Sequence, residues 1–165
     1  MWYKTRGTIL YDPPRPGMKR KAVNTGTERG IKYSIDWWCV IQVHDYDLAR
    51  YYRWWVQSQK WIKLHPPAWG AHVSITRGEE PSDELKHFWK KHDQLEIELE
   101  YRHGVRNAGD KWCEEDGPRR EGQSDFWFID VRHPLIREIR DELGFESNWN
   151  SHMTVGRYLK EANVT

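Results

Sequence analysis

Two six-residue stretches decide the fold predicted for this chain: Ala71-His72-Val73-Ser74-Ile75-Thr76 and Ser151-His152-Met153-Thr154-Val155-Gly156. Each places a histidine and a hydroxyl residue two positions apart, with apolar residues between and after them. Successive side chains of a β-strand point to opposite faces. Each stretch therefore predicts a strand that shows an imidazole and a hydroxyl, about 6.5 Å apart, to one face and apolar side chains to the core.

The two histidine stretches each end a similar series of predicted elements. A strand, a helix and the histidine strand follow one another twice along the chain, once up to His72 and again up to His152. The predicted strands lie at 4–11, 35–43, 70–76, 94–102, 126–131 and 152–158, and the predicted helices lie at 46–60, from Ser82 onward, and at 134–143. This order favours an α+β fold that is duplicated into two lobes, each ending in a histidine-bearing strand.

Length and charge narrow the class of protein. The 165 residues suit a single domain covering 1–165. Lys and Arg number 26 and Asp and Glu 25, which argues against a long nucleic acid or a membrane as partner but is compatible with a local basic pocket. No apolar run reaches the roughly 18 residues of a membrane span, and no signal peptide is evident, so we expect a cytoplasmic protein. Two cysteines do not make a disulfide framework.

The residue types in the two stretches suit cleavage of a phosphodiester bond. Such cleavage needs a base for the attacking oxygen and an acid for the leaving oxygen, and imidazole serves as either near neutral pH. His72 and His152 are the expected acid–base pair, in roles that the sequence does not assign. Ser74 and Thr154 are the expected donors to the phosphate oxygens. No cluster of carboxylates and histidines with metal-ligand spacing accompanies them, so we expect catalysis without a metal or another cofactor.

Paired His-x-Ser/Thr strands in two pseudo-symmetric halves resemble the 2H phosphoesterase superfamily, over residues 35–158 in architecture. That superfamily includes RNA 2′,5′-ligase-like proteins, cyclic phosphodiesterases and RNA-trimming nucleases. The resemblance implies antiparallel sheets that line a central cleft between two lobes, with the helices outside. It also implies that the four motif residues lie on the floor of the cleft.

Within that superfamily the chain is similar to a compact phage branch, the anti-CBASS nucleases that destroy cyclic oligonucleotide immune signals. The similar features are the small size, the strand Tyr3-Lys4-Thr5-Arg6-Gly7, the Tyr51-Tyr52 helix and the Ala71-His72 entry into the first motif. The resemblance implies a 3′,5′-linked cyclic di- or trinucleotide as substrate. The neighbouring 2′-hydroxyl would attack the phosphate, in the host bacterial cytoplasm if the protein is phage-encoded.

Aromatic side chains are the candidates for holding bases. The chain has 11 tryptophans, which either fill the core or, near a site, stack on bases. Tyr11, at the end of the first strand, and Trp112, in a long polar loop, are the candidate stacking residues, with ordinary packing or a solvated loop ring as the alternative. Thr76 shares the expected face of His72 and Ser74 and is the third candidate substrate-binding residue.

Several basic residues lie near the motifs in sequence. Arg77 and Arg157 follow their histidines at the same offset, but strict alternation turns them to the opposite face, which predicts surface charge. The long polar loops at 12–30 and 103–125 are of the kind that forms either functional lids or disordered segments. The first loop carries a basic cluster that suits either an anion-binding lid or a solvated loop: Arg15, Lys19, Arg20 and Lys21.

Three other functions remain open from the sequence. A related enzyme would act on linear RNA ends or on 2′,3′-cyclic phosphates, although the near-zero net charge disfavours long RNA. A non-catalytic nucleotide sponge would have no need of both His72 and His152. An RNA-binding module would use the many aromatic residues and would show a steep salt dependence without turnover. The oligomeric state is not readable from the sequence.

Overall fold

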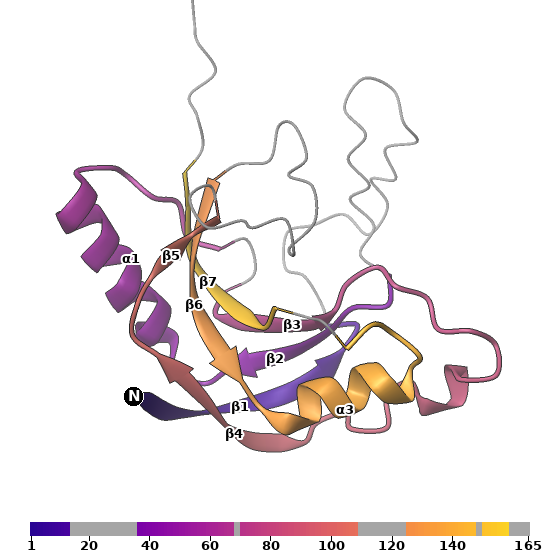
Figure 1. Ribbon diagram of the computed structural model, residues 1–165. Coiled ribbons are helices and arrows are strands. Elements are labelled where there is room, and N and C mark those ends of the chain that lie inside the picture. Colours follow the sequence, from indigo (N-terminus) through magenta and orange to yellow (C-terminus); the bar gives the residue numbers. More distant parts are fainter. Residues whose placement is uncertain (14–35, 68–69, 109–124, 148–149, 159–165) are drawn as a thin grey trace, which may run out of the picture.

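The computed structural model describes residues 1–13, 36–67, 70–108, 125–147 and 150–158 (Figure 1). Its strands are β1 (Trp2–Tyr11), β2 (Cys39–Val43), β3 (His72–Thr76), β4 (Glu96–Arg102), β5 (Arg106–Asn107), β6 (Asp125–Arg132) and β7 (His152–Tyr158). The helices are α1 (Tyr46–Lys60) and α3 (Pro134–Glu142), together with a 3-10 turn at Lys86–Phe88. Within these described ranges, no helix is long and apolar enough to cross a membrane.

The seven described strands join one antiparallel sheet, which closes on itself (Figure 1). The strand order is β4-β1-β2-β3-β7-β6-β5, and β4 also pairs with β6. In that closing pair, Glu100 lies opposite Arg132 and Tyr101 lies opposite Val131. Six strands therefore form a closed barrel, and the short β5 pairs with β6 outside this ring.

The expected duplicated α+β fold, with two lobes and a central cleft between them, is wrong. The repeated series of elements is present, as β2-α1-β3 and β6-α3-β7, but both series belong to one closed sheet. The two histidine strands pair directly, with Val73 opposite Met153. Each helix also packs on the histidine strand of the other series, α1 on β7 and α3 on β3. Because the strands pair and the helices pack between the two series, the chain forms one barrel where the sequence pattern predicts two lobes.

Both helices begin at residues that cap them. Asp45 precedes α1, and its carboxylate accepts a hydrogen bond from the backbone N–H of Asp47 at 3.1 Å. Such a bond satisfies one of the amides that lack a partner in the first turn of a helix. His133 precedes α3, where its Nδ1 accepts from the N–H of Leu135 at 3.0 Å. Gly144, in the left-handed conformation at φ 75°, follows the end of α3, where glycine is favoured.

Two predicted elements are shorter than the sequence pattern indicates. The strand expected from residue 35 begins only at Cys39, because Trp37 has a left-handed backbone conformation at φ 54°. The helix expected from Ser82 is reduced to turns and a single 3-10 turn. The chain becomes extended at Trp89, whose indole donates to the carboxylate of Asp12 at 3.0 Å.

The apolar sides of the strands and helices form one core. Val73 and Ile75 of β3 and Met153 and Val155 of β7 are buried there, with at most 1% of each residue exposed. They belong to one cluster with buried side chains of both helices, Leu48, Ala49, Tyr52, Val56, Ile136 and Ile139. Burying such an aliphatic side chain contributes roughly 1.5–3 kcal/mol. A slip of either strand by one residue would expose the whole set, so the register of the histidine strands is strongly determined.

The opposite side of the sheet is polar, and we call it the polar face. On three neighbouring strands, Thr8 lies opposite Gln42, and Gln42 lies opposite His72. Farther around the ring the same face carries largely exposed ion pairs, Lys4–Glu98, Arg6–Glu96 and Arg132–Glu100. The strand predicted at 94–102 alternates between the two faces, because the glutamates of β4 lie on the polar face and Leu99 lies in the core.

Candidate active site

The two histidine motifs lie side by side because β3 and β7 are neighbours in the ring. Val73, the second residue of β3, lies opposite Met153, the second residue of β7. Both side chains are buried in the core, at 0% and 1% exposure. Because neighbouring residues of a strand point to opposite faces, the residues that flank this pair point to the polar face, where each is half-buried.

The antiparallel register determines which of these polar side chains meet. One step from the central pair, His72 faces Thr154 and Ser74 faces His152 across the two strands. Opposite residues in such a pair have Cβ atoms about 4.5–5.5 Å apart, and diagonal neighbours, such as the two histidines, about 7–8 Å. The register thus brings two imidazoles and two hydroxyls together on the polar face.

Each imidazole is oriented by the backbone in the same way. The Nδ1 atom of His72 lies 3.2 Å from the carbonyl oxygen of Gly70, and that of His152 lies 2.9 Å from the carbonyl oxygen of Asn150. A carbonyl oxygen only accepts, so Nδ1 carries the hydrogen in both rings. The lone pair of the neutral ring is then on Nε2, where a general base needs it. In the charged ring, Nε2 carries the proton that a general acid gives.

Trp38 supports the first motif from the residue before β2. Its buried ring packs edge-on against His72, with ring centroids 5.4 Å apart. Its indole N–H donates to the hydroxyl oxygen of Ser74 at 3.1 Å. One tryptophan therefore contacts both functional side chains of the motif and restrains their orientation.

The second histidine is bordered by two phenylalanines of β6. Phe126 stacks on His152 with ring centroids 5.7 Å apart, and Phe128 lies tilted against it at 5.0 Å. Phe128 is also the residue opposite Thr154 on the neighbouring strand. The imidazole of the second motif is therefore set in a largely apolar wall.

The surroundings of His152 favour its neutral form. Burial lowers the pKa of this imidazole. The carbonyl of Asn150 and the charge of Asp130 act in the opposite direction, while the charges of Arg106 and Arg77 add to the lowering. The net direction is downward from the ordinary pKa, which favours the neutral ring with its lone pair on Nε2.

The first motif ends in a β-bulge. Ser74 lies opposite Val40, and Thr76 lies opposite Cys39, so two steps along β3 match one step along β2. Ile75 is the extra residue of this bulge. An extra residue reverses the alternation beyond it, so the following side chains point to the face opposite to the one predicted from strict alternation.

The second motif contains a bulge at the matching position. Thr154 lies opposite Phe128, and Gly156 lies opposite Trp127, so two steps along β7 match one step along β6. Val155 is the extra residue. In both motifs the bulge residue comes directly after the hydroxyl residue, which makes the two strands alike in backbone geometry as well as in sequence.

The first bulge removes Thr76 from the polar face. Its side chain is fully buried, and its hydroxyl donates to the carbonyl oxygen of Trp37 at 2.9 Å and accepts from the N–H of Cys39 at 3.1 Å. The expectation that Thr76 shares the face of His72 and Ser74 is therefore wrong. The hydroxyl bonds the backbone of the core side and does not extend the phosphate contacts.

The same bulges turn Arg77 and Arg157 toward the histidines. Arg157 lies opposite Phe126, whose ring stacks on His152. Beyond the first bulge Arg77 follows the core-facing Thr76, which directs it to the polar face, and its charge adds to the lowering of the pKa of His152. The expectation that alternation directs both arginines to the opposite face is wrong, because each strand gains one residue between the histidine and the arginine.

The charges of Arg77 and Arg157 also repel each other. Desolvation lowers the pKa of Arg77, and the charge of Arg157 lowers it further. Within the described ranges neither guanidinium forms an ion pair with a carboxylate, and the Nε atom of Arg157 is buried without a hydrogen-bond partner. Two guanidinium groups without a neutralising carboxylate beside two imidazoles favour an anionic ligand.

Each bulge is held by an arginine of the helix that packs on it. Arg140 of α3 donates to the carbonyl oxygen of Ile75 at 2.9 Å, and Arg53 of α1 donates to that of Val155 at 3.3 Å. Arg140 is only 2% exposed and also bonds both carboxylate oxygens of Glu79, at 2.9 and 3.0 Å. The crossed packing of the helices therefore fixes the backbone turns that direct the two arginines to the polar face.

The end of the second motif is closely packed. A Cβ atom on Gly156 would lie 2.9 Å from a methyl carbon of Leu64 and 3.3 Å from Cγ of Arg53, so a larger residue would require these side chains to shift. The backbone of Arg157 exchanges two hydrogen bonds of 2.9 Å with that of His65. These contacts hold the segment after α1 against the second bulge and fix the position of Arg157.

The predicted base-stacking residues do not join this site. Tyr11 is 6% exposed in the core, and its ring packs edge-on against Trp89 at 4.9 Å. The expectation that Tyr11 stacks on a base is wrong, because its ring faces are covered. Trp112 lies outside the described residues, as do the members of the basic cluster Arg15, Lys19, Arg20 and Lys21. In the described part of the chain, no group of three or more His, Cys, Asp or Glu side chains is placed to hold a metal ion.

Sequence reasoning missed several residues of the site. Arg77 and Arg157 carried a signal, their equal offset from the histidines, which the assumption of regular alternation overrode. Gly156 is a second signal, since a glycine inside a strand often marks a bulge. Trp38 and Asp130 have no local signal, because they reach the motifs only through strand pairing.

Comparison of the chain with models of protein families, with curated proteins and with solved structures finds no match. A fold alone does not identify a function. The function therefore has to be inferred from the two motifs and the charged groups around them.

Proposed function

We propose that this protein is a phosphodiesterase that works without a metal ion, by acid–base catalysis between His72 and His152. The observation that carries this proposal is the pairing of β3 and β7, which brings both imidazoles and both motif hydroxyls together on one face of the sheet. In each ring, Nδ1 lies against a backbone carbonyl, so the neutral ring carries its lone pair on Nε2, the atom that takes or gives the proton in this proposal.

The proposed substrate is a 3′,5′-linked ribonucleotide, whose 2′-hydroxyl lies beside the scissile phosphate. His152, kept neutral by its lowered pKa, takes the proton of this hydroxyl on Nε2. The 2′-oxygen attacks phosphorus, the bond from phosphorus to the 5′-oxygen breaks, and protonated His72 gives its Nε2 proton to that oxygen. The products are a 2′,3′-cyclic phosphate and a 5′-hydroxyl, and water can open the cyclic phosphate in a second step.

The remaining groups of the site would stabilise the charge that builds on the phosphate. Ser74 and Thr154 supply hydroxyl donors beside the imidazoles, and Arg77 and Arg157 supply charged donors. A preorganised donor of this kind typically contributes about 10²–10³-fold in kcat. The near-symmetry of the two motifs provides such donors from both strands.

We further propose a cyclic di- or trinucleotide as the substrate, cleaved in the cytoplasm of a bacterial host so that a phage evades CBASS immunity. The resemblance of the motifs to the phage branch of the 2H phosphoesterases implies this substrate. The balance of 26 basic and 25 acidic residues supports a small nucleotide over a long RNA, whose binding depends on many phosphate contacts.

A substrate panel assayed in EDTA tests the proposal. It contains cyclic dinucleotides, cyclic trinucleotides, RNA oligomers, a mononucleoside 2′,3′-cyclic phosphate and a cyclic dinucleotide that lacks the 2′-hydroxyls. The cyclic ribonucleotides should be cut fastest and the deoxy analogue not at all. Faster cleavage of RNA oligomers or of the 2′,3′-cyclic phosphate would show that the proposed substrate is wrong. The proposed acid–base mechanism would still stand.

The sponge alternative has its own signature. A sponge depletes free ligand without forming product, and the double variant His72→Ala/His152→Ala would then deplete the ligand as well as the wild-type protein does. For an enzyme, product formation should disappear in the double variant while the folded state is retained, as measured by circular dichroism.

A further inference from the structure

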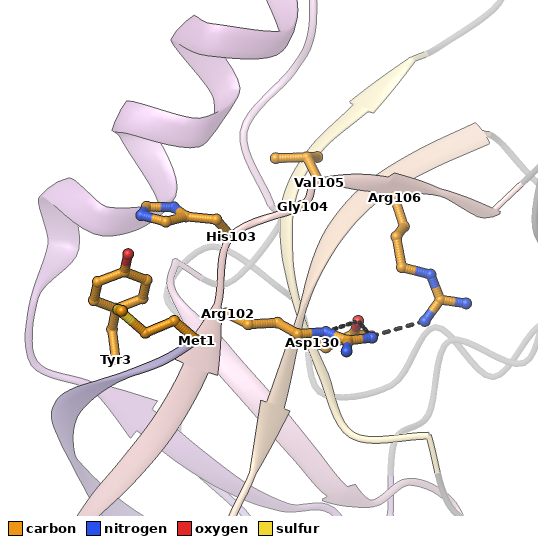
Figure 2. A pocket seen from close by; sticks show the side chains of 8 residues that line it. All are labelled: Met1, Tyr3, Arg102, His103, Gly104, Val105, Arg106 and Asp130. Atoms are coloured by element: carbon orange, nitrogen blue, oxygen red, sulfur yellow. Dashed lines mark hydrogen bonds and ion pairs between the residues drawn. The ribbon is translucent and has the colours of Figure 1, made fainter.

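A cavity opens where β4 ends and β5 begins, beside the candidate active site. Its volume is about 480 Å³, and it is lined by Met1, Tyr3, Arg102, His103, Gly104, Val105, Arg106 and Asp130 (Figure 2). Cavities of a few hundred Å³ hold ligands of nucleotide size. The space therefore suits a larger group than a single inorganic ion.

Two arginines and one carboxylate give this cavity its charge. Arg102 donates to one oxygen of Asp130 from Nε at 2.9 Å and from Nη2 at 2.7 Å, and Arg106 donates to the other oxygen from Nη1 at 2.8 Å (Figure 2). The side chain of Asp130 is 9% exposed, against 49% for Arg102 and 23% for Arg106. Two positive charges held by one buried negative charge leave the cavity wall with an excess of positive charge.

The two guanidinium groups are held in fixed orientations. Arg102 lies over the ring of Trp2 at 5.3 Å, and Arg106 lies over the ring of Phe128 at 5.1 Å. Each guanidinium has five N–H donors, and Asp130 accepts two from Arg102 and one from Arg106. Planar donors fixed in this way match the oxygens of a phosphate group and lose little conformational freedom on binding.

Strand pairing connects this cavity to the motif residues. Asp130 lies opposite His152, and Arg106 lies opposite Phe128, whose ring contacts His152. Opposite residues on neighbouring strands have Cβ atoms about 4.5–5.5 Å apart. A substrate whose scissile phosphate lies between the two imidazoles therefore brings its next nucleotide toward Arg102 and Arg106.

We propose that the Arg102–Arg106 cavity binds the neighbouring nucleotide of the substrate, with its phosphate on the two guanidinium groups. This inference rests on the proposed function and narrows it. The substrate then carries at least two phosphate groups, as a cyclic or linear oligonucleotide does, and a mononucleoside 2′,3′-cyclic phosphate leaves the cavity empty. Tyr3 and Val105 border the part of the cavity that receives the sugar and base (Figure 2).

Equilibrium binding of two probes without 2′-hydroxyls tests this inference. One is a 5′-phosphorylated deoxydinucleotide with two phosphate groups, and the other is the same dinucleotide without the 5′-phosphate. The variants Arg102→Gln and Arg106→Gln should weaken binding of the two-phosphate probe roughly ten-fold, because each removes a charge-assisted contact. Binding of the one-phosphate probe should stay within about two-fold.

Two further variants serve as controls for the binding measurement. Arg106→Lys keeps the charge without the planar fork and should lose less affinity than Arg106→Gln. Arg137→Gln, on the exposed side of α3, is the matched control and should change neither dissociation constant. Thermal unfolding of each variant shows whether the fold is retained. Equal weakening of both probes, or no weakening of either, would overturn the inference.

The binding result also separates this inference from the proposed function. If the wild-type protein cleaves no phosphodiester but Arg102 and Arg106 still discriminate between the probes, the catalytic proposal fails and the nucleotide subsite stands. If oligonucleotides are cleaved but the probes are not discriminated, the catalytic proposal stands and the subsite fails.

Discussion

Arg140 donates a hydrogen bond to the carbonyl oxygen of Ile75 at 2.9 Å and so joins α3 to the bulge residue of the first histidine strand. The same guanidinium donates from Nε to the carbonyl oxygen of Glu146 at 2.7 Å. That bulge directs Arg77 to the polar face, and the charge of Arg77 adds to the lowering of the pKa of His152. A helix that packs on the core side therefore determines which charge appears on the polar face.

Substitution of Arg140 measures how much its hydrogen bonds to the bulge and to Glu79 contribute to the stability of the protein. Arg140→Met keeps much of the volume but leaves Glu79 and the Ile75 carbonyl without their donor, so the free energy of unfolding should fall by about 3 kcal/mol. Urea unfolding measures the change. Arg137→Met, an exposed position of the same helix, is the control and should stay within about 0.5 kcal/mol. Similar losses in both variants would contradict a special role for Arg140.

Removal of the Arg77 charge should move the pH dependence of cleavage to higher pH. The proposed base His152 must be neutral, so kcat/KM rises with pH through its pKa, which lies below the ordinary value of about 6.5. Arg77 contributes to that lowering, so Arg77→Gln should raise the pKa and shift the acidic limb upward. Arg77→Lys keeps the charge and should leave the limb in place. An unshifted limb in Arg77→Gln would count against the assignment of His152 as the base.

Protonation of His133 in acid should lower the free energy of unfolding, because the charged ring cannot cap α3. Its Nδ1 caps α3 by accepting from Leu135, which only the neutral ring can do. Burial lowers the pKa of His133, so its stabilisation is present above the unfolded value of about 6.5 and is lost as the pH falls through the folded pKa. His133→Asn supplies a cap that does not titrate.

The comparison is made by urea unfolding at pH 7 and at pH 5. The loss of unfolding free energy between the two should be smaller in His133→Asn than in the wild-type protein, by up to about 1 kcal/mol. His152, whose pKa is also lowered, contributes a loss of the same sign in both proteins. Equal pH dependence of the two proteins would show that the cap does not titrate in this range.

Trp38→Phe tests whether the indole positions the motif hydroxyl. This change keeps an aromatic ring beside His72 and removes the N–H that donates to Ser74. The expected result is a loss of roughly ten-fold in kcat, with a loss of about 1 kcal/mol in stability for the missing hydrogen bond. Ser74→Ala should lower kcat through the same contact, so the double variant should lose less than the product of the two single effects. If the loss of kcat in the double variant equalled the product of the two single losses, Trp38 and Ser74 would act independently, which would contradict this prediction.

Much of the secondary structure is predictable from local patterns, although the fold is not. The strands at 4–11, 70–76, 126–131 and 152–158 and the alternation of each histidine with its hydroxyl residue depend on neighbours in the sequence and are confirmed. The shared face of each histidine and its hydroxyl residue also follows from a two-residue period. These features supply the candidate residues but not their arrangement across strands.

The arrangement between strands depends on contacts that no local pattern contains. The pairing of Val73 with Met153 and the closure of β4 on β6 join segments far apart in the chain, and they turn two apparent lobes into one barrel. The bulge at Ile75 is held by Arg140 from the other half of the chain, so regular alternation misplaced Thr76 and Arg77. Likewise, the burial of Tyr11 results from packing against Trp89.

The chemistry of the two imidazoles is tested most directly by phosphorus NMR of the first product formed from a 3′,5′-linked cyclic ribodinucleotide in EDTA. The expected result is an early 2′,3′-cyclic phosphate signal with the wild-type protein and no such signal with His72→Ala or His152→Ala. Each loss should correspond to about 10²–10⁴-fold in rate, because each histidine serves one proton transfer. A phosphomonoester as the first product, or an undiminished signal from the double histidine variant, would contradict catalysis by His72 and His152.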